Sequence, residues 1–256
     1  MLGLVADLTT TTLILALLIA LVSGIIKGAV GFAMPLIIIS GLSSLIDPKH
    51  ALAAIIIPIV VSNLLQTFRQ GVAPALDAIK DHWRYVLIVC IMIFTFAQLV
   101  PHIPSKIFYF VLGVPVVALA AIQLVGVSFT ISEKHRGWAE WVIATISGAL
   151  GGLAGTWGPT TVLYLLAINT PKAKQVIVQG VVFGVGSFTI LGAHIQSGIL
   201  NAYTMPLSFL LLPIALIGMW IGFQIQDKLD QARFKQITLI VLVIAGLNIL
   251  RRGFFG

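Results

Sequence analysis

Long apolar stretches separated by short polar ones dominate the chain. Most approach or exceed the roughly 20 residues that a helix needs to cross a bilayer. None shows the alternation of apolar and polar positions that is typical of outer-membrane barrel strands. The stretches cover Thr11–Leu42, Ala51–Phe68, Trp83–Leu99, Lys106–Val127, Trp138–Ile168, Val176–Ile195, Met205–Ile225 and Phe234–Leu250. This pattern predicts an all-α polytopic membrane protein with about eight spans.

Composition excludes a soluble globule and narrows the possible partners. Of 256 residues, 59% are hydrophobic and 9% are charged, against about 25% charged in ordinary soluble domains. The net charge is +7, but the Lys and Arg residues are scattered singly, so no nucleic-acid partner is expected. The single cysteine, Cys90, excludes an intrachain disulfide. Residues Met1–Thr12 contain no Lys or Arg, so we expect mature protein there and not a secretory signal.

Two of the apolar stretches are too long for one crossing, and they share a motif. Ser-Gly-x-x-x-Gly-x-x-Gly-x-x-x-Pro occurs at Ser23–Pro35 and again at Ser147–Pro159, an offset of 124 residues. We therefore predict an internal duplication, with a first transmembrane repeat at residues 1–127, a linker at 128–137 and a second repeat at 138–256. Transporters built from two repeats place their substrate at the repeat interface.

The distribution of basic residues tests how the long stretches fold. If each crosses once, Lys and Arg divide equally between the two sides. If each folds into a hairpin of two shorter helices, ten basic residues lie on one side and four on the other, a bias that the positive-inside rule favours. Each repeat then has five helical segments, about ten in all, and the two repeats insert with opposite orientation. We expect both termini outside, and the linker and the Arg69–Arg84 loop in the cytoplasm.

The hairpin tips, Gly28–Pro35 and Gly151–Pro159, are the strongest candidates for a site. Glycines free the backbone, and a proline suits the first turn of the helix that follows. The unpaired N–H groups of such a half-helix attract anions. The alternative is that these glycines only allow close helix packing, and that the threonines bond their own helix. The candidates from the two tips are Gly28, Gly31, Phe32, Pro35, Gly152, Gly155, Thr156, Trp157, Pro159 and Thr160.

Lys27 precedes the first tip and is a basic residue within an apolar stretch. An ammonium at the bilayer centre costs about 2.5 to 3.5 kcal/mol on insertion scales and usually serves a function. The acidic residues all lie near predicted helix boundaries, so an anionic substrate is its natural partner. The alternative is that Lys27 extends to the membrane interface.

Further polar side chains are candidates for lining the cavity from equivalent helices of the two repeats. These are Asn63 and Gln66 in the first repeat, and Gln179 and Ser187 in the second. Hydrogen bonding between helices is the alternative role for each. Arg69 and His194 lie near helix ends, where we expect them at the membrane interface.

The sequence contains no pattern for a catalytic or metal site. There is no His-x-x-x-His motif and no paired-carboxylate pattern, so we predict no catalytic residue, metal or cofactor. Proton-coupled transporters commonly use carboxylates within the span. Export of an anion needs none, because a potential of 100 mV, inside negative, drives each negative charge outward by about 2.3 kcal/mol.

The duplicated glycine motif, the turns at Asp47-Pro48 and Thr170-Pro171 and the charged linker resemble the sulfite exporter TauE/SafE family of bacterial membrane proteins. The resemblance extends over nearly the whole chain. It implies a permease for sulfur-containing anions such as sulfite, sulfonates and sulfoacetate. The second repeat has Gly151 where the first has Lys27, which argues against a symmetric two-cation site.

We therefore predict a secondary transporter, in the bacterial inner membrane, that exports a small sulfur-containing anion by alternating access. An importer coupled to a cation and an anion channel are alternatives, and an intramembrane enzyme is a third. The expected partners are the anionic substrate and the lipid bilayer; the oligomeric state is left open.

Overall fold

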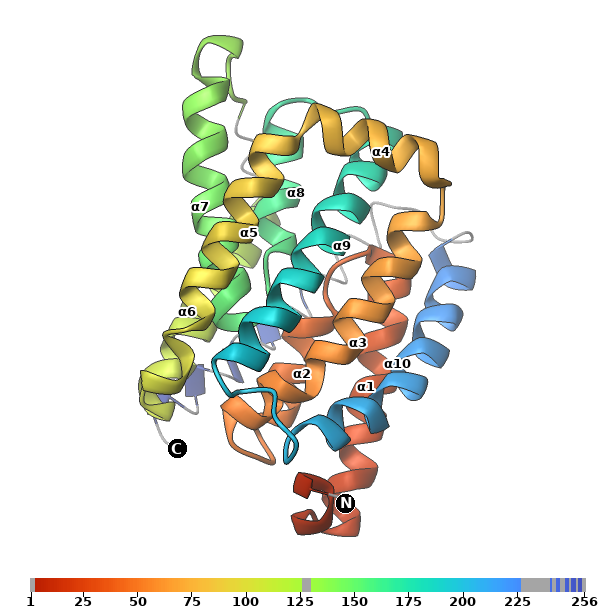
Figure 1. Cartoon of the computed structure of the whole chain (residues 1–256), viewed down its shortest axis with the longest axis vertical. Coiled ribbons are helices and arrows are strands. Elements are labelled where there is room, and N and C mark those ends of the chain that lie inside the picture. The colour runs from red at the N-terminus through yellow and green to blue at the C-terminus, as the bar shows by residue number, and fades with distance from the viewer. Residues whose placement is uncertain are drawn as a thin grey trace.

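The fold is a bundle of helices. The computed structural model describes residues 3–125 and 130–226, with individual positions between 240 and 254. Ten α-helices and three short 3-10 helices make up this described part, which contains no strand (Figure 1). Five of the helices are long and apolar enough to cross a membrane. The prediction of an all-α polytopic membrane protein is thus confirmed, while most of the last predicted span, Phe234–Leu250, lies outside the described residues. The elements are η1 (Gly3–Asp7), α1 (Thr10–Val30), α2 (Met34–Leu42), α3 (Pro48–Phe68), α4 (Val72–Asp81), α5 (Trp83–Ala97), η2 (Val100–His102), α6 (Ser105–Leu124), η3 (Glu133–His135), α7 (Arg136–Ala154), α8 (Gly158–Ala167), α9 (Lys172–Gln196) and α10 (Met205–Gln226).

The first long apolar stretch folds into the hairpin α1–α2. Thr9 caps the start of α1, its side chain accepting the Thr12 N–H. Gly31 ends the helix with φ 94°, a left-handed conformation that favours glycine. The chain then turns back, so that Gly41 near the end of α2 lies against the Ile19 side chain of α1.

The second long stretch forms the matching hairpin α7–α8. Gly155 ends α7 with φ 64°, and its N–H donates to Gly151 O at 2.7 Å. Ser147 Oγ donates to Trp157 O at 3.0 Å and ties α7 to the turn. Both predicted hairpins are confirmed, but the turns are shorter than expected: Gly28 and Gly152 remain helical, and the chain breaks one glycine later in each motif.

Each hairpin packs on a helix of the other predicted repeat. Helix α1 lies along α10 and α7 lies along α5, while α3 and α9 contact each other. In the membrane-spanning windows of α3 and α9, 67% of residues are buried, against 39% in α1, α5 and α10, so α3 and α9 form the centre. The pairs Asn63–Phe183 and Thr67–Gly180 show that α3 and α9 run antiparallel. This arrangement is compatible with inverted repeats, which stay a prediction.

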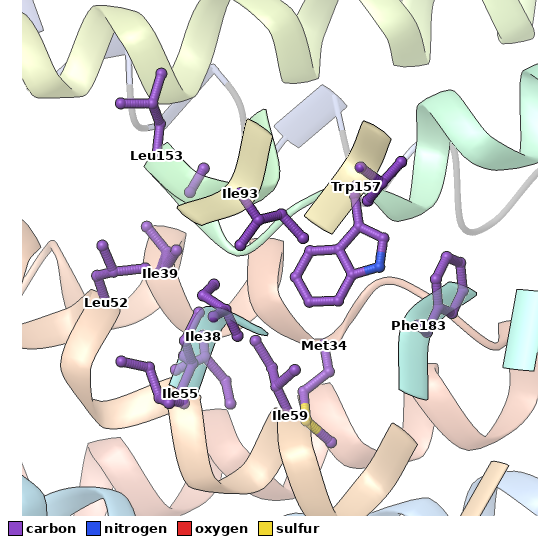
Figure 2. Packing of buried hydrophobic residues seen from close by; sticks show 14 of the residues in the cluster. Met34, Ile38, Ile39, Leu52, Ile55, Ile59, Ile93, Leu153, Trp157 and Phe183 are labelled. Atoms are coloured by element: carbon purple, nitrogen blue, oxygen red, sulfur yellow. The ribbon is translucent and has the colours of Figure 1, made fainter. Parts of the chain in front are cut away.

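The buried hydrophobic core lies where the second tip packs against α3. Trp157 lies above Met34 and Ile59, with Ile93 of α5 beside it (Figure 2). The predicted loop Arg69–Arg84 instead contains the helix α4, which crosses the end of the bundle (Figure 1). Ala75 and Ala78 of α4 are buried, whereas Val72 and Leu76 are 58% and 52% exposed.

Candidate functional site

The two hairpin tips meet inside the bundle. A Cβ atom added at Gly158, the first residue of α8, would lie 2.7 Å from the Phe32 Cβ of the first tip. Gly155 faces Ile55 and Ile59 of α3 and Ile190 of α9. The sequence-predicted tip residues from the two repeats therefore contact one another between the central helices.

Lys27 lies beside the first tip and is buried, with 3% of its surface exposed. Its Nζ donates to Asn63 Oδ1 at 2.5 Å and to Gln66 Oε1 at 3.2 Å. A third, longer contact reaches Gly31 O at 3.4 Å. The side chain thus turns inward and does not extend to the membrane interface, which was the alternative left open by the sequence.

The groups around the Lys27 ammonium are all neutral. Its acceptors are two side-chain amides and one backbone carbonyl, and within the described part of the chain no carboxylate pairs with it. These amide and carbonyl dipoles stabilise an ammonium but do not neutralise its charge. A charge without a counter-charge is costly to bury. An anion beside Lys27 would supply the missing compensation.

Phe183 of α9 connects this cluster to the second tip. Its backbone carbonyl accepts from Asn63 Nδ2 at 3.1 Å. The Lys27 Nζ lies 6.0 Å from the centroid of its ring, and the Trp157 ring lies edge-on to it at 6.3 Å. Phe183 was not among the predicted residues, because a phenylalanine in an apolar helix gives no sign that its carbonyl and ring face polar groups.

Trp157 supplies a second hydrogen-bond donor beside the Phe183 ring. The side chain is 2% exposed, and its Nε1–H has no partner among the described residues. In Figure 2 the indole nitrogen points toward Phe183. A buried indole N–H normally finds an acceptor, so this one is available to an oxygen of a bound anion.

Of the predicted cavity-lining polar residues, three gather at the first tip and one does not. Gln66 Nε2 and Gln179 Oε1 lie 3.2 Å and 3.7 Å from the position that a Cβ of Gly31 would take. Asn63 and Gln66 both contact Lys27. Ser187 Oγ donates instead to Gly184 O of its own helix at 2.6 Å, so it shows neither the predicted cavity-lining role nor the alternative of hydrogen bonding between helices.

The hydroxyl groups of the second tip bond to one another. Thr160 Oγ1 donates to Ser147 Oγ at 2.7 Å, and Thr161 Oγ1 donates to Trp157 O at 2.8 Å. Tyr85 Oη of α5 donates to Thr161 Oγ1 at 3.2 Å. These bonds hold the tip rigid and leave the Thr160 hydroxyl engaged within the protein. Thr156 is buried, with 6% of its surface exposed.

The middle glycines of the two motifs, Gly28 and Gly152, serve close helix packing. A Cβ at Gly28 would overlap the backbone of Met219 and lie 3.0 Å from Gly222 Cα of α10. A Cβ at Gly152 would lie 2.8 Å from Ala97 N of α5. Their place in the fold is therefore explained by helix contact, and we do not keep them in the site.

The two tip prolines stand at the starts of short helices, and Arg69 and His194 lie at the ends of long ones. Pro35 stands in the first turn of α2, whose start has no side-chain cap, and Pro159 is the second residue of α8. The Arg69 guanidinium lies over the Phe223 ring at 4.1 Å. His194 was expected at the interface, but it is fully buried, because the chain after α9 folds back: Leu200 N–H donates to His194 O at 2.9 Å.

Comparison with known families identifies the group to which the chain belongs. The family model described as Sulfite exporter TauE/SafE matches residues 16–249. The chain belongs to the TauE/SafE family. Neither a curated protein nor a solved structure matches it. Membership assigns this TauE/SafE protein to membrane transport of sulfur-containing anions, and both hairpin tips lie within the matched residues.

Proposed function

We propose that this protein is a secondary transporter that exports a small sulfur-containing oxyanion, with Lys27 as the cation that binds it. The observation that carries this is the buried Lys27 ammonium, held by neutral oxygens only. A protonated lysine selects for negative solutes, and a bound anion offsets the cost of burying its charge.

The proposed site lies next to Phe183, whose ring is 6.0 Å from Lys27 Nζ and 6.3 Å from the Trp157 ring. Sulfite and sulfonates carry three oxygens around sulfur, so one molecule can accept several hydrogen bonds at once. Gln66 and Gln179, next to Gly31, add side-chain amides that can reorient to keep a hydrogen bond with the substrate. This assignment keeps Lys27, Gly31, Asn63, Gln66, Trp157 and Gln179 as binding residues and leaves Ser187 and Thr160 as structural.

The contact between Phe32 and Gly158 favours alternating access over an open channel. Tips that touch fill the centre of the bundle, so an anion can pass only if one hairpin moves relative to the other. The direction follows from the membrane potential, which drives each negative charge outward by about 2.3 kcal/mol per 100 mV. Export then requires no coupling ion.

Efflux of sulfite from proteoliposomes tests the proposal. The variant Lys27→Met removes the charge and replaces it with an apolar chain of similar length. Charge-assisted hydrogen bonds contribute about 1.5 to 3 kcal/mol, so we expect sulfite efflux to fall about ten- to a hundredfold. Lys106→Gln, at an exposed lysine outside the site, is the matched control and should transport normally.

Two further measurements separate the parts of the proposal. Sulfite should raise the melting temperature of the wild type but not of Lys27→Met, because a ligand that binds only the folded state stabilises it; sulfoacetate, thiosulfate, taurine and sulfate rank the substrates. An inside-negative diffusion potential should accelerate efflux. Normal transport by a folded Lys27→Met protein would remove Lys27 from the site, and efflux that ignores the potential would reject electrogenic export.

A further inference from the structure

A second cationic site lies at the end of the bundle where the linker enters. A cavity of about 330 Å³ opens between the α4–α5 corner and the start of α7. Its lining includes Lys80, Arg84, Arg136, Glu140 and Tyr164. These basic residues are scattered along the sequence, and only the folded bundle brings them to one place.

The two carboxylates at this cavity are already matched by cations. Glu140 Oε2 pairs with Arg84 at 3.3 Å, and Asp81 Oδ2 pairs with Lys174 of α9 at 2.7 Å. Lys80 and Arg136 have no carboxylate partner in the described part of the chain. The cavity thus has two positive charges without acidic partners, which is the charge distribution that suits an anion.

A buried histidine contributes no further charge at neutral pH. His82 also lines the cavity and is 5% exposed. Burial, followed by the charges of Lys174 and Arg136, lowers the pKa of His82 below its usual value. The imidazole is therefore neutral near pH 7, and the cationic character of the cavity comes from its lysine and arginine side chains.

The position of the cavity favours a lipid headgroup over a transported solute. The cavity lies at the ends of α5 and α7, where Trp83, Trp138 and Trp141 are 57%, 74% and 58% exposed; tryptophans gather at the headgroup level of membranes. Its inner end is closed by Tyr164, which stacks on Tyr85 at 4.9 Å and is 1% exposed.

We propose that this cavity binds the phosphate of an anionic phospholipid from the leaflet on the linker side. Lys80 and Arg136 donate to the phosphate oxygens, as guanidinium and ammonium groups do in charge-assisted pairs. Glu140 holds Arg84 beside them. The exposed Trp83 ring packs against the apolar part of the lipid. This site is separate from Lys27 and does not depend on the transported substrate.

Lipid titration of the purified protein in neutral detergent tests the proposal. Phosphatidylglycerol should raise the melting temperature, and native mass spectrometry should show a bound lipid. The double variant Lys80→Gln with Arg136→Gln should weaken the apparent affinity at least about tenfold, because it removes two charge-assisted interactions. Lys106→Gln, an exposed lysine at the start of α6, removes a charge outside the cavity and should bind as the wild type does.

Three results would overturn the proposal. One is an equal effect of phosphatidylcholine, whose headgroup has no net charge. Another is full phosphatidylglycerol binding by the double variant. The third is that inorganic phosphate alone saturates the effect, which would assign the cavity to a soluble anion. Because Lys80 and Arg136 are both exposed, the double variant is expected to fold, and lipid counting on the wild type gives an independent readout.

Discussion

The contact between α1 and α10 allows the most quantitative prediction. Gly222 of α10 faces Gly28 of α1, and a Cβ at Gly222 would lie 2.9 Å from both Ala29 N and Gly28 Cα, with the Ile25 carbonyl closer still. Ordinary contacts of a Cβ begin at about 3.4 Å. Gly222→Ala therefore forces the two backbones apart by more than about 1 Å at the Ile25 carbonyl. Overpacking of this kind costs about 1 to 3 kcal/mol.

Thermal melting of the detergent-purified protein, followed by tryptophan fluorescence, measures this cost. At about 2 to 4 °C per kcal/mol for a chain of this size, Gly222→Ala should lower the apparent melting temperature by several degrees. The control is Gly192→Ala in α9, where an added Cβ would meet nothing within 4 Å. Alanine favours a helix over glycine by up to about 1 kcal/mol, so the control should melt at the same temperature or higher. Equal melting of Gly222→Ala and wild type would show that α1 and α10 do not touch through this glycine.

Three further predictions concern the first tip, the membrane surface and the second tip. Gly31→Ala places a side chain at φ 94°, with its Cβ 3.2 Å from Gln66 Nε2, so it should lower both the melting temperature and sulfite efflux; the left-handed conformation alone costs about 1 to 2 kcal/mol. The pKa of His82 is lowered by burial, so the folded state favours the neutral imidazole. The neutral imidazole contributes its full stabilisation above the unfolded-state pKa of about 6.5. That stabilisation is lost as the pH falls through the lower pKa of the folded state. The melting temperature should therefore fall less between pH 8 and pH 5 for His82→Asn than for the wild type. An equal fall in both proteins would contradict this. Tyr85→Phe removes the hydrogen bond to Thr161 and should cost about 0.5 to 1.5 kcal/mol, measured by melting; no change would show that this bond does not stabilise the tip.

The glycine motifs illustrate what a repeat in the sequence can and cannot predict. The fixed offset located both hairpins, since a proline after a glycine cluster permits a new helix start wherever it occurs. It did not distinguish the glycine that turns the chain from the glycine that faces a neighbour. Gly31 and Gly155 have positive φ, whereas Gly28 and Gly152 contact other helices, and that difference depends on helices from the other half of the chain.

Lys27 was recognisable from its sequence context, but its surroundings were not. A lone basic residue in an apolar stretch has few explanations, because the cost of its burial is large anywhere in the bilayer. Whether it turns inward depends on the Asn63 and Gln66 amides, 36 and 39 residues away. The Phe183 carbonyl and ring left no trace in the sequence, since an apolar residue type says nothing about what its backbone faces.

The sequence alone determined the class of the protein, its hairpins and its family resemblance, because hydrophobic length and local backbone preferences act over a few neighbouring residues. Only the tertiary structure decided which side chains share a site. It placed Trp157 next to Phe183 and gathered Lys80 and Arg136 around one cavity, groups that the apolar pattern leaves unrelated. Contacts between distant segments depend on how whole helices pack, and packing is set by the shape of many side chains together.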